Sequence, residues 1–421
     1  MIDVVRNKKT YRREPDLRSS ATRFDNIISR RFEKSQEKIV NPVAQDFLRC
    51  YNIRRTSRKA AEAKTEAERS LEMNTNTNMM EYILDTVKRL LAIPSPSGYT
   101  AEAADFVKKE LEDMGYHPVI TKKKGVIADL GGGSGQDGEA ILLASHFDTL
   151  GAMVREIKAD GRLMLSNVGG LNANNVECEN CTVHTRDGRK YSGTIQLIDA
   201  SIHVNGKYSE TLRTFDTVEL VLDELVKTAE DVEKLGIMNG DFVTCDPRTV
   251  LTESGFLKSR FLDDKLCSGI LLGLARYFYE TGTKPKRRVY LDFTSYEEVG
   301  HGGAADIPED VGEMISVDMG CVGKGLKCDE TMVSICAKDS VGPYDYDLTT
   351  RLIQLAQAHG LQFAVDVYPH YASDVDVTLK AGHNLRHSVI GPGVYASHGY
   401  ERTHVQGIEN TYELLKAYLT E

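Results

Sequence analysis

Histidine and carboxylate residues gather at the ends of predicted strands, where they could bind metal ions. His146 and Asp148 follow the apolar run AILLAS, Asp318 closes the run MISV, and Glu297 with Glu298 follows RRVYLDFTS. The carboxyl ends of strands in an open α/β sheet meet at one edge, so these side chains are expected to lie close together. Their imidazole and carboxylate groups suit zinc, cobalt or manganese rather than a structural thiolate site.

Two further clusters complete the candidate set. Asp263 and Asp264 in SRFLDDKLC precede a predicted helix, and His398 and His404 lie in SHGYERTH. Taken alone, each cluster has an ordinary explanation: His146 could be a hydrogen-bonded core histidine, and the aspartate pair could cap a helix. All five clusters at strand ends or following loops favour one site. A carboxylate bridging two ions about 3.5–4 Å apart would allow metal-assisted hydrolysis.

The alternation of side chains along a strand suggests which chemical role each member of a residue pair can take. Strand positions i and i+2 project to the same side, so one of His146 and Asp148 can bind a metal while the other fixes it. Adjacent strand residues point in opposite directions. One of Glu297 and Glu298 can therefore bind an ion while its neighbour faces the substrate as a base.

The segments around these residues alternate between helix and strand patterns. Amphipathic helices are predicted over residues 81–94, 101–116, 267–280, 348–360 and 407–419, and strands over 125–133, 140–145, 287–295 and 314–320. This order predicts an α/β fold, a central mostly parallel or mixed sheet with helices on both faces.

Residues 153–252 follow a different pattern of short alternating segments separated by turns. One of these turns is the Asp187-Gly188 pair, a strong hairpin signal. We interpret 153–252 as an inserted all-β subdomain for assembly, lying between two parts of a catalytic domain, residues 79–152 and 253–421.

Charge divides the 421-residue chain into two regions. The net charge is -10, but residues 1–72 carry +7 and the remainder -17. The acidic body has no general attraction for nucleic acid or anionic lipid, so any nucleic-acid binding would have to come from the basic N-terminal extension, residues 1–78, which we interpret as disordered or dispensable.

Hydropathy and cysteine spacing indicate the cellular compartment to expect for this protein. No apolar run approaches the ~20 residues that span a bilayer, and the N-terminus lacks the apolar core of a signal peptide. The eight cysteines lack the spacing of a disulfide framework. A cytoplasmic protein without a membrane partner is expected.

Several motifs together resemble the glutamyl aminopeptidase family, also called the tetrahedral aminopeptidase or cellulase-homologue family. They are HFDTLGAMV, GDFVTCDP, SRFLDDKLCSGILL, TSYEEVGHGGA, SVDMG and SHGYERTH. The resemblance covers residues 80–421 and implies a metallo-aminopeptidase with a zinc-peptidase-like fold, which hydrolyses N-terminal residues from short peptides. It also implies that the β insert is a dimerisation subdomain and that the chain forms a homo-oligomer, from a dimer to a hollow dodecamer.

The resemblance further implies two divalent metal ions per subunit, zinc or cobalt, with manganese as a third option. His146 and Asp318 would hold one ion, Glu298 and a late histidine would hold the other, and Asp263 would bridge them.

The same resemblance assigns the remaining roles. Glu297 would be the general base, and Asp148 would orient His146. The spacing from Glu401 to the last helix selects His398 as the final ligand, with His404 as the alternative.

Two details resemble a divergent clade that is associated in part with osmoprotectant dipeptide metabolism. They are the form of SHGYERTH and the presence of His301. A preference for acidic N-termini is therefore not implied. His301 and Arg402 could contact substrate, although a loop histidine and a surface arginine are the simpler interpretations.

Other functions fit parts of the same pattern. A deacylase or carboxypeptidase of the same clan would use a related two-metal site. An assembly or binding protein with a vestigial metal site is a further alternative, motivated by the basic extension.

Overall fold

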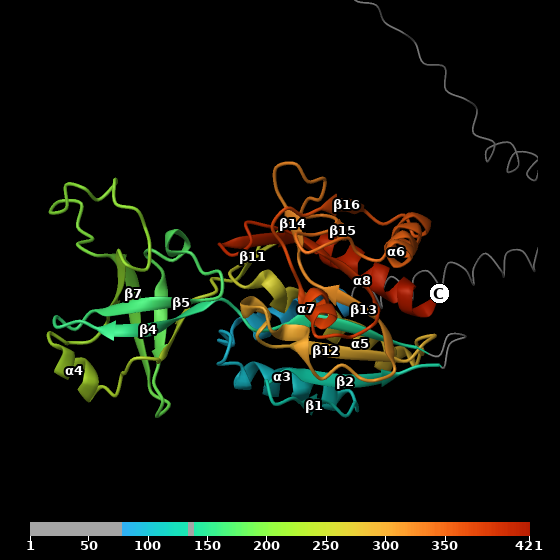
Figure 1. The fold of residues 1–421 in the computed structure, drawn as a ribbon, viewed down its shortest axis with the longest axis horizontal. Helices are drawn as coiled ribbons and strands as arrows, with labels where there is room; N and C mark the ends of the chain where they lie inside the picture. Colours follow the sequence, from blue (N-terminus) through green and yellow to red (C-terminus); the bar gives the residue numbers. More distant parts are fainter. Residues whose placement is uncertain (1–77, 134–138) are drawn as a thin grey trace, which may run out of the picture. The chain divides into compact units, whose positions relative to one another are not determined.

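The computed structural model describes residues 78–133 and 139–421, which Figure 1 shows as a ribbon. It contains a 12-stranded mixed sheet with its helices and a closed six-stranded barrel. The predicted α/β class with an inserted all-β subdomain is therefore confirmed. The predicted basic extension lies, apart from residue 78, outside the described residues. Within the described part, no helix has both the length and the apolarity that a membrane crossing requires.

Four neighbouring strands form the centre of the sheet and run parallel: β12 (Val289–Thr294), β3 (Ala140–His146), β13 (Val311–Val317) and β17 (Arg386–Tyr395). Antiparallel pairing on both sides makes the sheet mixed, because β2 pairs with β12 and β18 pairs with β17. The other strands of this sheet are β1 (Val119–Ile120), β2 (Val126–Gly131), β10 (Val250–Leu251), β11 (Phe256–Ser259), β14 (Gly320–Val322), β15 (Val333–Lys338), β16 (Phe363–Val367) and β18 (Glu401–His404).

Side chains of the sheet contribute to a separate apolar core on each face. On β3, which is buried throughout, Ile141 and Leu143 belong to one core, whereas Leu142 and Ala144 belong to the other. This burial on both faces explains why the strand is an unbroken apolar run.

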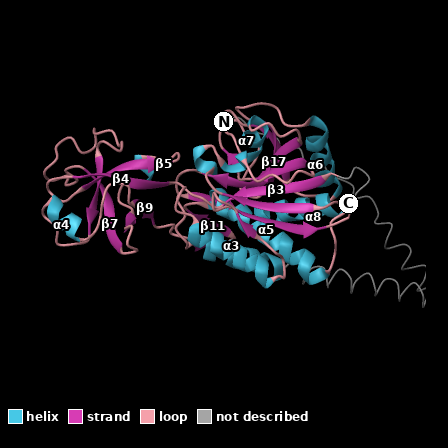
Figure 2. Ribbon diagram, turned by 60° about the horizontal axis from the view of Figure 1, so that its bottom comes forward, coloured by secondary structure: helices cyan, strands magenta, loops and turns pink. Residues whose placement is uncertain are grey.

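Helices cover both faces of the sheet, as predicted. The first face packs against a helix over residues 78–91 and against α3 (Ala101–Asp113), α5 (Leu262–Thr281), α6 (Tyr346–Ala358) and α8 (Val405–Thr420). The second face packs against α7 (Asp374–Lys380), and Figure 2 shows α7 and α3 on opposite sides of the strands.

The barrel has its own apolar core and interrupts the sheet domain between β3 and β10. Its strands, in order around the barrel, are β4 (Gly151–Ile157), β5 (Leu163–Val168), β8 (Val218–Leu222), β7 (Lys190–Leu197), β6 (Asn180–His184) and β9 (Phe242–Cys245). Helix α4 (Ala229–Lys234) lies between β8 and β9. The predicted hairpin joins β6 to β7, and Gly188 supplies the positive φ of 87° that its turn requires.

Two glycines allow α5 to pack closely against the helix over 78–91. A Cβ atom at Gly273 would overlap the side chain of Ile83, and one at Gly269 would overlap Val87. The contact therefore depends on the absence of side chains at these positions.

We predict that Gly273→Ala lowers the free energy of unfolding, by up to about 2 kcal/mol. Alanine is favoured over glycine inside a helix by about 1 kcal/mol, but overpacking a core costs about 1–3 kcal/mol. Urea denaturation measures the change. Adding Ile83→Ala should relieve the clash, so that the double variant loses less stability than the two single losses combined. A Gly273→Ala variant at least as stable as the wild type would contradict the packing argument.

Candidate metal centre

The candidate site lies where the four parallel strands end. His146 is the last residue of β3, and Asp318 directly follows β13. Glu297 lies three residues beyond β12, and His398 three residues beyond β17. The structure thus brings together the residues that the sequence placed at strand ends, at the edge where open α/β sheets build their sites.

Asp263 lies between two histidine rings. Its carboxylate oxygens are 3.2 Å from Nε2 of His146 and 3.5 Å from Nε2 of His398. Neither Asp263 nor Asp264 has helical backbone angles, and the peptide bond between them is cis. The residue at the cap of α5 is Phe261. The aspartates therefore face the site and are not simply the helix cap.

The expectation that Glu297 and Glu298 continue a strand is wrong. β12 ends at Thr294, and both glutamates lie in the following 3-10 turn η2 (Glu297–Val299). Glu297 Oε2 is 3.5 Å from Nε2 of His146, whereas Glu298 Oε2 is 3.6 Å from Nε2 of His398. The turn, rather than strand alternation, directs the two carboxylates toward different histidines.

Asp374 holds the segment that carries this turn. Its carboxylate accepts hydrogen bonds from Oγ1 of Thr294 (2.5 Å) and from the backbone N–H of Gly303 (2.8 Å). Gly302 leaves no room for a side chain, because a Cβ there would overlap Asp374 and lie 3.1 Å from Cα of Glu297. Asp374 thus has a structural role, because its contacts fix the segment on both sides of the two glutamates.

Two groups of side chains in the described residues have the spacing to hold a metal ion. One group is His146, Asp264 and Asp318, and the other is His146, Asp263 and Glu298, with ligand atoms within 4.8 Å of one another in each group. Asp264 was considered in the sequence only as one of a pair, with no separate role. Its Oδ2 accepts the backbone N–H of His146 at 3.4 Å, while its buried Oδ1 has no hydrogen-bond partner.

The site contains more acidic side chains than basic ones. Burial and neighbouring carboxylates raise the pKa of Asp318 to about 7 and that of Asp264 well above its usual range. Burial also raises the pKa values of Glu297 and Glu298. Asp263 is the exception: burial opposes its charge, but the neighbouring imidazoles hold its pKa below the usual value. A divalent cation would relieve the repulsion and satisfy the unpartnered oxygen, so the residues fit a metal site.

Asp148 supports His146 through its backbone as well as its side chain. The ring Nδ1 of His146 is 3.0 Å from the backbone oxygen of Asp148 and 3.7 Å from its carboxylate. That carboxylate accepts hydrogen bonds from Oγ of Ser97 (2.5 Å) and from the backbone N–H of Glu297 (3.2 Å). Ser97 lies in SPSGYT, whose Ser and Gly content predicts a loop but gives no sign of a contact with the site.

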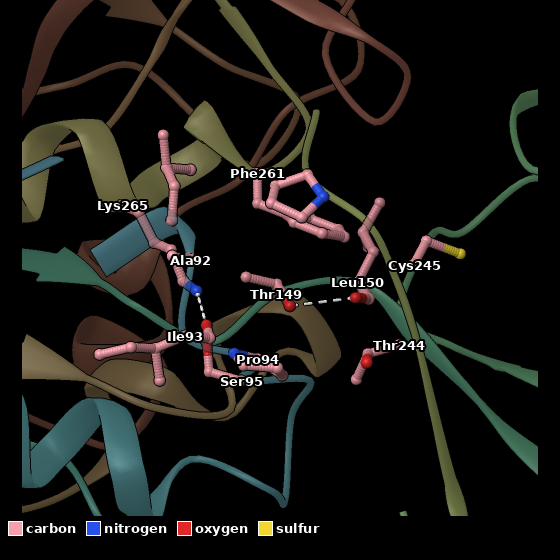
Figure 3. Close-up of a pocket in the computed structure, with 12 residues that line it drawn as sticks. Ala92, Ile93, Pro94, Ser95, Thr149, Leu150, Thr244, Cys245, Phe261 and Lys265 are labelled. Carbon is pink, nitrogen blue, oxygen red and sulfur yellow. Dashed lines mark hydrogen bonds between the residues drawn. The ribbon is translucent and has the colours of Figure 1, made fainter. Parts of the chain in front are cut away.

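Lys265, directly after the aspartate pair, is a fully buried cation whose role the sequence did not reveal. Its ammonium donates to the backbone oxygen of Leu90 (3.0 Å), near the end of the helix over 78–91, and to that of Ile93 (2.5 Å), beside which Figure 3 shows it. Burial lowers its pKa to about 7. The contact ties the aspartate pair to the end of this helix, where the Leu90 oxygen also accepts the backbone N–H of Ile93 at 3.1 Å.

The two late histidines have different surroundings. His404 is the N-cap of α8: its Nδ1 accepts the backbone N–H of Gln406 at 3.1 Å, and its Nε2 is 2.9 Å from the backbone oxygen of Ser254. His398, by contrast, lies beside Asp263 and Glu298. Arg402 pairs with Glu330 at 3.1 Å and stacks over the Phe256 ring.

Comparison with known proteins supports one family. A family model described as M42 glutamyl aminopeptidase matches residues 125–414. The sequence is 41% identical to the putative aminopeptidase YhfE of Bacillus subtilis (strain 168) over 337 residues, which cover 80% of this chain and 96% of that protein.

Solved structures of peptidases have the same fold. An aminopeptidase from the archaeon Desulfurococcus kamchatkensis superposes with a TM-score of 0.72 at 19% identity, over 81% of this chain and 95% of that one. The TET1 peptidase of Pyrococcus horikoshii, described as able to assemble into a tetrahedron or a large octahedral shell, superposes with a TM-score of 0.70 at 20% identity, over 80% and 99% of the two chains.

We predict that divalent metal stabilises the protein and that Asp264 contributes to the effect. Zinc at 100 times its Kd should raise the free energy of unfolding by about 2.7 kcal/mol for each ion bound, and EDTA should remove the gain. Asp264→Asn removes a buried acid, so this variant should be at least as stable as the wild type in EDTA but should gain less from zinc. Thermal denaturation with and without zinc measures both effects.

The matched control is Asp105→Asn, because Asp105 is exposed on α3. This control should behave like the wild type under both conditions. Equal zinc gains for the wild type and Asp264→Asn would contradict a role for Asp264 in the metal site.

Proposed function

The chain belongs to the M42 glutamyl aminopeptidase family, and from that premise we propose that it is a two-metal aminopeptidase that removes N-terminal residues from short peptides. Membership, which confirms the resemblance seen in the sequence, makes it a hydrolase that acts on peptide bonds and implies divalent metal cofactors. The observation that carries the two-metal proposal is the position of Asp263, whose carboxylate oxygens each approach a different imidazole.

The proposed ligands divide into two halves that share Asp263. His146 and Asp318 would hold one ion, and Glu298 and His398 would hold the other. The unpartnered Oδ1 of Asp264 and the raised pKa of Asp318 support the first half. The 3.6 Å separation of Glu298 Oε2 from Nε2 of His398 supports the second. Oxygen and nitrogen donors of this kind favour zinc, cobalt or manganese.

Glu297 is the proposed general base. Bound divalent ions supply Lewis-acid polarisation of the scissile carbonyl. The carboxylate of Glu297 accepts a proton from the attacking water and donates it to the leaving amine. Two observations support this role: burial raises the pKa of Glu297, which improves proton transfer near neutral pH, and its backbone N–H is fixed by Asp148.

We further propose that the chain forms a homo-oligomer through the barrel. The connection between β7 and β8 exposes Ile202, Val204 and Leu212, at 64%, 75% and 72% of their surfaces. Grouped exposed apolar side chains are typical of protein interaction sites. The likeness to TET1, which is described as forming closed shells, agrees with assembly.

A substrate panel tests the activity. The metal-reconstituted protein should release the N-terminal residue from tripeptides and aminoacyl substrates with a free amine and should leave their N-acetylated counterparts intact. Chromatography of the products measures both reactions. Preferential cleavage of the N-acetylated substrates would identify a deacylase, and release of C-terminal residues a carboxypeptidase. Either result would contradict the proposal.

We predict that Glu297→Gln lowers kcat by about 10²–10⁴, because general acid–base catalysis contributes that much. Both ions should be retained, since the base is not a ligand. Steady-state kinetics and metal analysis measure the two quantities. Glu309→Gln is the matched control because Glu309 is exposed in the same loop region. Wild-type turnover by Glu297→Gln, or loss of an ion, would overturn the assigned role.

A further inference from the structure

His398 is a partly exposed residue on a turn, so its backbone must be held for its ring to have a fixed position. Its φ is 62°, and 43% of its side chain is exposed. The backbone N–H donates to Oε1 of Glu401 at 3.0 Å. The backbone oxygen accepts a hydrogen bond from Nδ2 of Asn175, also at 3.0 Å. Glu401 belongs to the sheet domain, whereas Asn175 belongs to the segment between β5 and β6 of the barrel.

The same barrel segment also contacts the ring of His398. A Cβ at Gly170 would lie 2.5 Å from Nδ1 and 2.8 Å from Cε1 of that ring, so a side chain there must displace it. A Cβ at Gly169 would lie 3.1 Å from the backbone oxygen of Glu298. Residues on the Glu298 and His398 side of the site are thus packed against the insert.

Arg260 fixes Asn175 relative to the sheet domain. Its guanidinium, 3% exposed, donates to the backbone oxygen of Asn175 and lies 3.1 Å from Oε1 of Glu179, both in the insert. It also donates to the backbone oxygen of Gly399 at 3.4 Å. One buried cation therefore joins the insert segment to the turn that carries His398.

We propose that Asn175 is a positioning residue for the metal centre, through which the barrel insert fixes His398 and with it the half of the site formed by Asp263, Glu298 and His398. This inference rests on the proposed two-metal function. The other half has contacts within the sheet domain: His146 with Asp148 and Asp264, and Asp318 with the backbone oxygen of Ile390.

Metal titration of the Asn175→Ala variant tests the proposal. The metal-free protein is titrated with Zn²⁺ by calorimetry, and with Co²⁺ while the visible absorption of the ion is recorded. The wild type should bind two ions. Asn175→Ala should bind the first ion with wild-type affinity and the second about 10–100-fold more weakly, the usual loss when a residue that orients a metal ligand is removed. The Co²⁺ absorption of the second equivalent should change, whereas that of the first should not.

Two further variants serve as the negative control and as the reference for complete loss of the second ion. Asn174→Ala removes an adjacent exposed side chain whose amide contacts Asn172 and not His398, so this variant should bind both ions like the wild type. His398→Ala should lose the second ion altogether and defines the maximum effect.

A second variant keeps the test independent of how Asn175→Ala folds. Gly170→Ala should displace the imidazole and weaken the second ion in the same way, because the three atoms nearest to its Cβ all belong to the His398 ring. Gly342→Ala, where a Cβ would meet nothing within 4 Å, is its control, because Gly342 lies outside the insert. Hydrogen exchange of residues 396–400 in the metal-free proteins should be faster in Asn175→Ala than in Asn174→Ala.

The outcomes separate the two proposals. A wild type that binds fewer than two ions would contradict the proposed two-metal function. A wild type that binds two ions, together with Asn175→Ala and Gly170→Ala variants that bind the second ion equally tightly, would overturn the positioning role alone. Equal weakening of both ions in these variants would also overturn it, because the effect would then be general destabilisation.

Discussion

The structure depends above all on the repulsion among acidic side chains that are buried close together at one edge of the sheet. Asp263, Asp264, Glu297, Glu298 and Asp318 share one edge of the sheet with two imidazoles. Burying carboxylates this close together is unfavourable unless they are neutralised by protons, hydrogen bonds or cations. The raised pKa values of most of these acids show that the fold holds them together despite the cost. Such an arrangement is what a divalent cation site requires before the ion binds.

A second set of buried acids keeps the first set in place. Asp148, Asp374 and Glu401 each accept backbone N–H groups from segments that carry the proposed ligands. Glu401 joins two such segments, because its carboxylate oxygens accept the N–H groups of Asp263 and His398 at 3.1 and 3.0 Å. Turns can therefore present catalytic groups at fixed positions, which two-metal chemistry needs.

Sequence patterns predicted the larger features because these depend on burial and periodicity. The unbroken apolar run before His146 reflects a strand buried on both faces, and Asp187-Gly188 reflects a hairpin turn. Candidate site residues were found because carboxyl ends of parallel strands converge. Backbone geometry was not predictable in the same way: the 3-10 turn that carries Glu297 and Glu298 resembles the end of a strand in sequence. Contacts made across long sequence separations were also missed, including those of Ser97 with Asp148 and of Asn175 with His398, since no local pattern encodes them.

The most direct test of the two-metal centre is anomalous X-ray diffraction from crystals of the zinc-loaded protein. We expect two peaks about 3.5–4 Å apart, on either side of the Asp263 carboxylate. One should lie beside His146 and Asp318, and the other beside Glu298 and His398. A single peak, or a second peak at His404 in place of His398, would contradict it.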